Sequence, residues 1–213
     1  MKNSIKFNFK AHYRTSHVVH REETELVFAL HGYGQLAEFF LRKLSPLFNK
    51  ERLIVVPEAT NYFYQEGFSG RVGANWMTRH ERETAIANNH TYLNELMSSF
   101  LMKYKTTPKV KVLGFSQGAA TAARWVSQLE QKVDTLILWG GGFAHDMMID
   151  KTKSALEHAN TYVVLGRQDE FVTPESMKRQ EDIISTLKLN VEKRFYDGGH
   201  DLNLPLLMEL LET

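Results

Sequence analysis

The sequence predicts a single α/β domain with a mostly parallel central sheet and helices on both of its faces. Six short runs of β-branched and aliphatic residues alternate with longer stretches that have helical spacing, as in parallel sheets that are covered on both sides. The chain has 213 residues, a length more typical of one domain than of two. Its 43% hydrophobic and 24% charged residues are close to the usage of ordinary globular proteins.

The expected strands follow one another along the chain. Ile5, Phe7 and Phe9 alternate with polar residues and predict an antiparallel edge strand at the start of the sheet. The continuous apolar runs predict buried strands over residues 25–30, 52–56, 109–113, 135–139, 161–165 and 191–196.

Helices are expected between these runs, at 36–48, 86–101, 117–129, 174–187 and 204–211. The fourth begins with Thr173 and Pro174, which suit an N-cap and a first helical position. Residues 58–80 and 140–150 resist assignment, and loops of that length in a compact domain are more often functional than idle.

Composition excludes several classes of function. The 26 Lys and Arg residues balance 25 Asp and Glu residues, so no strong field recruits nucleic acid or an anionic membrane. The absence of cysteine rules out a cysteine nucleophile and suits a reducing compartment. The first fourteen residues lack the apolar stretch of a signal peptide, and no run approaches the roughly 18 apolar residues of a membrane span. We expect a cytoplasmic protein without stable membrane insertion.

The sharpest local motif is Gly-Phe-Ser-Gln-Gly at 114–118, between a predicted strand and a predicted helix. A serine on such a turn projects its hydroxyl above the sheet, and the flanking glycines avoid collisions with the neighbouring strand and helix. The turn also aims the Gln117 amide at the place where an oxyanion would form. We predict that Ser116 is a nucleophile; the alternative is a solvated serine at a glycine-bounded strand end.

A serine nucleophile needs a histidine base. In this fold the base follows the serine, which leaves three histidines, His145, His158 and His200. His158 lies in a charged helical stretch and His145 in an undefined loop. His200 follows a strand in the segment Asp-Gly-Gly-His, where two glycines let the loop carry the imidazole over the carboxyl edge of the sheet. We predict that His200 is the base.

The acid that orients this histidine should follow a strand between the serine and the base, as Asp169 does. Glu170 would point elsewhere along the backbone, and Asp197 is close enough to His200 to cap its turn instead. Asp169 would hold the imidazole tautomer and stabilise the imidazolium.

The segment His-Gly-Tyr-Gly at 31–34 follows the first buried strand and precedes a helix. Glycines on both sides of Tyr33 let its amide turn towards the serine, so Tyr33 and Gln117 are the expected oxyanion donors. His31 is expected to orient this loop by hydrogen bonds. Because no partner stands at a ligand-like spacing from it, we expect no metal.

Residues of the two unassigned loops are candidates for the acyl pocket, namely Trp76, Met77, Phe143, Met147 and Met148. Ordinary core packing is the alternative for each. Residues 140–160 leave no room for a large cap domain, which favours an open or shallow site.

Together these motifs resemble the phospholipase/carboxylesterase family of α/β hydrolases, which includes acyl-protein thioesterase-like and small bacterial esterases. The likeness covers nearly the whole chain in order, through the segments HGYG, VVPEA, GFSQG, LILWGGG, the strand before Asp169, and GGH. It implies hydrolysis of ester or thioester bonds without a cofactor, by a Ser116, Asp169 and His200 triad with Tyr33 and Gln117 as oxyanion donors. HGYGQ and LGRQD depart from the usual HGLGD and histidine-containing segments, which leaves the substrate open.

Two other segments match a known functional motif only in part. Gly140 to Gly142 lack the Lys and Ser or Thr of a phosphate-binding loop. Ser69 is not expected to be a nucleophile, because no buried strand precedes it.

Two other functions stay open: a ligand-binding module that does not turn over its ligand, and a peptidase on the same scaffold. The sequence favours a carboxylic ester or thioester hydrolase that acts on small acyl substrates.

Overall fold

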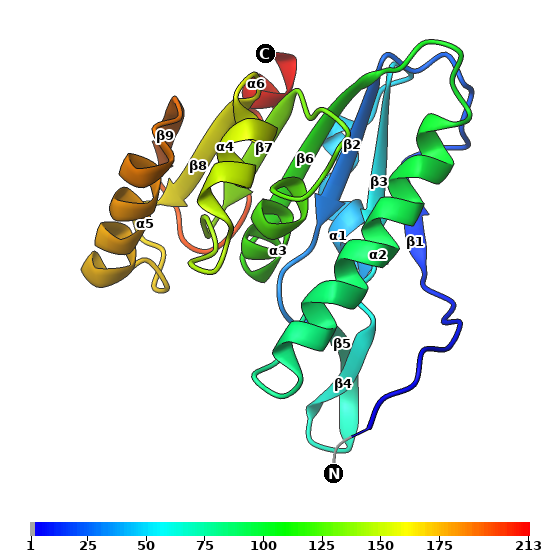
Figure 1. Cartoon of the computed structure of the whole chain (residues 1–213), viewed down its shortest axis with the longest axis horizontal. Helices are drawn as coiled ribbons and strands as arrows, with labels where there is room; N and C mark the ends of the chain where they lie inside the picture. The colour runs from blue at the N-terminus through cyan, green and yellow to red at the C-terminus, as the bar shows by residue number, and fades with distance from the viewer. Residues whose placement is uncertain (1–2) are drawn as a thin grey trace.

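Seven strands form the central sheet of the computed structural model, which describes residues 3–213 (Figure 1). In spatial order they are β1 (Tyr13–Thr15), β3 (Arg52–Pro57), β2 (Glu25–Leu30), β6 (Lys109–Phe115), β7 (Thr135–Trp139), β8 (Asn160–Gly166) and β9 (Val191–Tyr196). Only β1 runs antiparallel to its neighbour. The six predicted apolar strands and the mostly parallel sheet are confirmed.

Six helices cover this sheet: α1 (Ala37–Lys43), α2 (Arg82–Leu101), α3 (Gln117–Val126), α4 (Ile149–Leu156), α5 (Pro174–Leu187) and α6 (Leu204–Glu212). Successive strand residues point to opposite faces, so Phe28 packs in the core on the side of α2 and α3, whereas Val27 packs on the side of α1 and α6. Figure 1 shows α2, α3, α4 and α5 in front of the sheet. The five predicted helices are confirmed, with α1 followed by a short 3-10 turn at Ser45–Leu47, whereas α4 was not predicted.

The predicted edge strand at Ile5, Phe7 and Phe9 is wrong, because these side chains are exposed and the edge strand is β1. The reason lies in the register of the antiparallel pair, in which Tyr13 faces Pro57 at the end of β3. Earlier residues would need partners beyond Pro57, and there the chain turns away. The amide of Glu58 bonds the His12 carbonyl at 2.9 Å, and the pairing goes no further.

The unassigned residues 58–80 hold a two-stranded hairpin, β4 (Asn61–Glu66) and β5 (Ser69–Asn75). Figure 1 shows it extending beyond the end of the main sheet. Most of its side chains are exposed. Its sequence therefore has no need of the continuous apolar run by which the central strands were predicted. Its structural contribution is to the loop after β2, because the Gly34 amide bonds the Ala74 carbonyl and Gln35 bridges to Ala74.

Residues 3–213 contain no helix with the length and apolar character needed to cross a membrane.

Candidate active site

Ser116 lies on the sharp turn between β6 and α3, with φ of 56° and ψ of −118°. A positive φ is strained for a residue with a side chain. The turn brings backbone segments into close contact, since a Cβ at Gly118 would lie 2.3 Å from the Leu30 carbonyl oxygen and one at Gly114 would lie 2.4 Å from the Gly118 oxygen. Both glycines are therefore required by packing, which is the reason that the sequence motif has predictive value.

A continuous hydrogen-bonded chain joins the three predicted triad residues. The Nε2 atom of His200 lies 2.8 Å from the Ser116 Oγ, and its Nδ1 atom lies 2.7 Å from the Asp169 Oδ2. Asp169 is buried, whereas Ser116 and His200 are half-buried. The Phe171 amide donates to the other Asp169 oxygen at 2.9 Å. This bond fixes the carboxylate, which in turn orients the imidazole towards the serine.

The competing acids lie elsewhere. Asp197 is exposed and lies 3.5 Å from the Arg167 guanidinium, and Glu170 is also exposed. Of the three histidines that follow Ser116 in the sequence, His200 is the one that contacts it.

The loop after β2 lies directly against the nucleophile. A Cβ at Gly32 would come within 3.2 Å of the Ser116 Cβ, so the Gly32–Tyr33 peptide borders the serine from one side while Gln117 follows it on the other. Nearby bonds hold the loop, among them those from the Gln65 side-chain amide to the Gly34 carbonyl at 2.6 Å and from the Gly32 amide to the Gln35 side chain at 2.9 Å. The loop that contains Tyr33 and the residue after the nucleophile, Gln117, therefore both border Ser116.

The proposed pocket residues separate into three groups by burial. Trp76 and Phe143 are fully buried in the core, which fits the core-packing alternative, while Met77 and Met147 are half-buried. Met148 is exposed. Two glutamines hold the loops that contain these residues.

Each of these glutamines makes two hydrogen bonds to the backbone of a loop, one through the oxygen and one through the nitrogen of its side-chain amide. Gln117 accepts from the Trp76 amide and donates to the Met77 carbonyl, each at 2.9 Å. Gln180 of α5 accepts from the Phe143 amide and donates to its carbonyl, at 2.8 and 2.9 Å. The two loops beside the site are thus fixed to α3 and α5.

Phe171 was missed by the sequence reasoning. Its ring packs edge-on against the His200 imidazole, with the ring centroids 4.7 Å apart, yet 64% of its surface is exposed. Its position two residues after Asp169 could have indicated this, because a chain that returns the acid to the histidine also carries its neighbours there.

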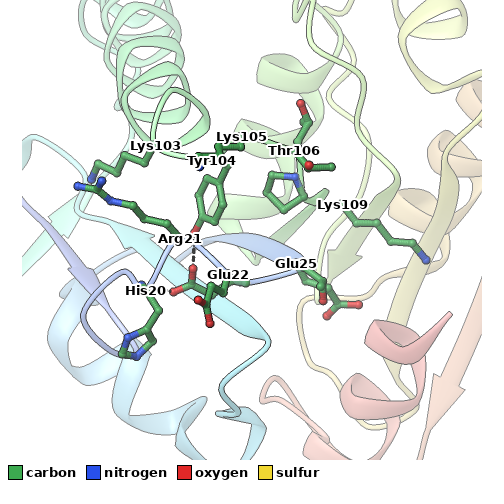
Figure 2. A pocket seen from close by; sticks show the side chains of 13 residues that line it. His20, Arg21, Glu22, Glu25, Lys103, Tyr104, Lys105, Thr106 and Lys109 are labelled. Atoms are coloured by element: carbon green, nitrogen blue, oxygen red, sulfur yellow. Dashed lines mark hydrogen bonds between the residues drawn. The ribbon is translucent and has the colours of Figure 1, made fainter.

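A cavity of about 790 Å³ lies at the opposite edge of the sheet (Figure 2). It is lined by residues 20–25 and 103–109, which lie at the amino ends of β2 and β6. Figure 2 shows Tyr104 in the middle of its lining, with Lys103 and Arg21 to one side. Ser116, Asp169 and His200 all follow the carboxyl ends of strands, so this cavity is separate from the triad.

Glu23 is buried beside this cavity and carries a strongly held negative charge. Its carboxylate accepts from the His20 amide at 2.7 Å and from the Tyr104 hydroxyl at 3.0 Å, and it lies 3.2 Å from His17 Nε2. Burial by itself raises the pKa of Glu23, but the hydrogen bonds outweigh burial and lower the pKa from 4.5 to about 2.

Glu23→Gln is expected to lower the free energy of unfolding at pH 7 by about 2–3 kcal/mol. The pKa of Glu23 is lower in the folded than in the unfolded chain. Its stabilisation is therefore complete above pH 4.5 and is lost as the pH falls from 4.5 towards 2. Urea unfolding of the wild type and Glu23→Gln between pH 7 and 3 measures this loss of stability.

The control is Glu22→Gln at an exposed neighbouring position, which should change the free energy of unfolding by no more than about 0.5 kcal/mol. A difference for Glu23→Gln that stays constant with pH would contradict the assignment.

Comparison with known proteins places the chain in a family. The sequence model of the phospholipase/carboxylesterase family matches residues 16–212. The comparison with curated proteins gives no match.

Solved structures share the fold at low sequence identity. A phospholipase/carboxylesterase from Dyadobacter fermentans has a TM-score of 0.71 at 18% identity, over 98% of this chain and 99% of the other. Acyl-protein thioesterase 2 from Zea mays has a TM-score of 0.72 at 14% identity, over 95% and 98%. A carboxylesterase from Mesorhizobium loti has a TM-score of 0.69 at 19% identity, over 95% and 94%. Family match and fold agree, and the chain belongs to the phospholipase/carboxylesterase family of α/β hydrolases.

Proposed function

We propose that this chain is a serine hydrolase that cleaves carboxylic esters or thioesters of small acyl substrates through an acyl-enzyme on Ser116. The observation that carries the proposal is the hydrogen-bonded chain from Asp169 through His200 to Ser116 at the start of α3. Membership of the family supports hydrolase chemistry in general. The cytoplasmic location and the absence of a cofactor that the sequence favours belong to the same proposal.

In the first half of the reaction, the Ser116 Oγ attacks the acyl carbon while His200 Nε2 takes its proton. The imidazolium that forms is stabilised by the Asp169 carboxylate. The carbonyl oxygen becomes an oxyanion that accepts from the Tyr33 and Gln117 amides, and each such donor is typically worth about a hundredfold or more in kcat. When the tetrahedral intermediate collapses, His200 returns the proton to the departing alcohol or thiol, and the acyl group stays on Ser116.

In the second half, water takes the place of the leaving group. His200 removes a proton from this water as it attacks the acyl carbon, and the same two amides stabilise the second oxyanion. Collapse releases the carboxylic acid, and His200 returns the proton to the Ser116 Oγ. Each step uses groups that lie within hydrogen-bond distance of one another or beside the serine.

The leaving group departs on the His200 side of the serine, where Phe171 lies. Because the Phe171 ring contacts the imidazole and is largely exposed, it is placed to touch an apolar or aromatic alcohol that receives the proton from His200. We infer that Phe171 gives the site a preference for such leaving groups over methanol or ethanol.

Phe171→Ala is expected to lower kcat/KM for phenyl butyrate about 5- to 10-fold, because an aromatic contact contributes about 0.5–1.5 kcal/mol beyond the buried area. For methyl butyrate, which has the same acyl group, the loss should stay within about twofold. The ratio of the two kcat/KM values cancels any general effect on the triad.

Phe48→Ala is the matched control for Phe171→Ala. Phe48 is also partly exposed but lies just before β3 begins, at the edge of the sheet away from the triad. It should leave the ratio unchanged. An unchanged ratio in Phe171→Ala would show that this ring does not contact the leaving group.

Hydrolysis of a p-nitrophenyl ester series from acetate to octanoate, together with acyl thioesters of the same acids, tests the proposed function. Turnover supports the proposal, and the acyl chain length with the highest kcat/KM indicates how long a chain the acyl pocket holds. If the protein binds these esters without hydrolysing them, the ligand-binding alternative replaces the proposal. Hydrolysis confined to peptide anilides would favour the peptidase instead.

A further inference from the structure

Both ring nitrogens of His31 are engaged in the buried interior next to the active-site loop. His31 is fully buried. Its Nε2 atom accepts from the Ala59 amide at 3.1 Å, and its Nδ1 atom lies 2.8 Å from the Gly32 carbonyl oxygen. A backbone amide only donates and a carbonyl only accepts. The imidazole must therefore be neutral, with its hydrogen on Nδ1.

The electrostatic surroundings agree with this assignment. Burial lowers the pKa of His31 below its usual 6.5, while the Gly32 carbonyl and the Glu58 carboxylate act in the opposite direction. The neutral ring is thus retained at neutral pH.

The Gly32 carbonyl belongs to the same peptide group as the Tyr33 amide. In a planar trans peptide the C=O and the N–H point in opposite directions, so a bond that fixes the Gly32 oxygen also fixes the direction of the Tyr33 hydrogen. Glycine at position 32 leaves the backbone free to rotate this peptide. If it rotated by half a turn, the carbonyl oxygen would replace the amide beside Ser116, and a developing oxyanion would meet a negative dipole.

We propose that His31 is the positioning residue that holds the Gly32–Tyr33 peptide in the orientation required for oxyanion binding. The inference rests on the proposed function of the Tyr33 amide. The bond from His31 Nδ1 to the Gly32 oxygen is shorter than the one from the Gln35 amide to the same oxygen, 2.8 against 3.3 Å. His31 is therefore the closer of the two donors that hold this carbonyl.

Trp76 links this peptide to the second oxyanion donor. Its indole packs against the His31 ring with centroids 5.1 Å apart and donates to the His31 carbonyl at 2.8 Å. Its backbone amide donates to the Gln117 side chain. The two proposed donors, at Tyr33 and Gln117, are thus held in one connected unit, which gives the buried Trp76 a supporting role in place of direct substrate contact.

Two substitutions separate the two hydrogen bonds of His31. The side-chain amide of Asn reaches the position of Nδ1, so His31→Asn can still donate to the Gly32 oxygen but loses the contact with Ala59. The longer side chain of Gln reaches the position of Nε2, so His31→Gln keeps the contact with Ala59 and loses the bond to Gly32. Each variant loses one buried hydrogen bond, which makes their expected losses of stability similar.

The kinetic expectation is that His31→Gln lowers kcat about 100-fold, the effect of losing one oxyanion donor, with KM changed less than about twofold. His31→Asn should keep kcat within about tenfold of the wild type. A residue that served folding alone would give both variants the same kcat, and that outcome would overturn the proposal.

Crystal structures of the two variants test the positioning without relying on activity. The Gly32–Tyr33 peptide should keep its orientation in His31→Asn and rotate in His31→Gln; an unrotated peptide in His31→Gln overturns the proposal. If the peptide rotates but the wild type hydrolyses no ester or thioester, the positioning by His31 stands and the proposed function fails.

A measurement on the wild type keeps the test open if a variant does not fold. Nitrogen-15 NMR of the histidine rings distinguishes a protonated from a bare ring nitrogen. The expected result for His31 is a hydrogen on Nδ1 and a bare Nε2 at neutral pH. A hydrogen on Nε2 would overturn the proposal, because the bond to Gly32 could not then form.

Discussion

Replacing Ser116 with alanine is expected to lower kcat/KM for a p-nitrophenyl ester by at least about 10⁴-fold. The variant lacks the oxygen that attacks the acyl carbon, and His200 then has no nucleophile to deprotonate. The fold should persist, because the Ser116 hydroxyl bonds the half-buried His200 and no core group. Initial rates measured beside thermal unfolding separate lost chemistry from lost structure.

The control for Ser116→Ala is Ser69→Ala. Ser69 follows Gly-Phe as Ser116 does, in the segment Gly-Phe-Ser-Gly at 67–70, but it lies on the exposed hairpin at the start of β5. It should leave kcat/KM within about twofold of the wild type. Residual activity above about 1% in Ser116→Ala, or a large loss in Ser69→Ala, would contradict the assignment of the nucleophile.

The second large effect is expected for Asp169→Asn, which should lower kcat about 10⁴-fold with little change in KM. An asparagine fills the same space, but its amide can donate to His200 Nδ1 and so favour the tautomer that has its hydrogen on Nε2. That imidazole cannot accept the Ser116 proton. Single-turnover kinetics with a p-nitrophenyl ester measure the acylation rate directly.

Asp197→Asn is the matched control for the acid. Asp197 is an exposed carboxylate three residues before His200, and it pairs with Arg167 on the surface. Its loss should change kcat by less than about twofold. A large loss of kcat in Asp197→Asn together with a small loss in Asp169→Asn would show that Asp169 is not the acid.

The local sequence predicted most of the fold and the residues that the geometry brings together at the site. The parallel strands are buried on both faces, so they appear as continuous apolar runs with clear boundaries. Ser116 and its glycines form a motif because the close approach of β2, β6 and α3 excludes larger residues. Asp169 and His200 could be found because each follows a strand, and the carboxyl ends of parallel strands meet at one edge.

Features that depend on long-range contacts were not predicted. The hairpin of β4 and β5 has exposed polar and aromatic residues on a ladder of only two strands, so no apolar run marks it. The start of the edge strand depends on where β3 ends, which the first residues do not reveal. Trp76 was a pocket candidate because it lies in one of the unassigned loops, and its burial depends on contacts with His31 and Gln117 that are distant in sequence.

The most direct test of the central claim is to identify the residue that a fluorophosphonate labels. Trypsin releases residues 112–124 as a peptide whose only serine is Ser116, so its mass reports the site. We expect one adduct per chain, on this peptide, with loss of ester hydrolysis in proportion to labelling. An adduct on another peptide, or full hydrolytic activity in protein labelled at Ser116, would contradict the assignment of Ser116 as the nucleophile.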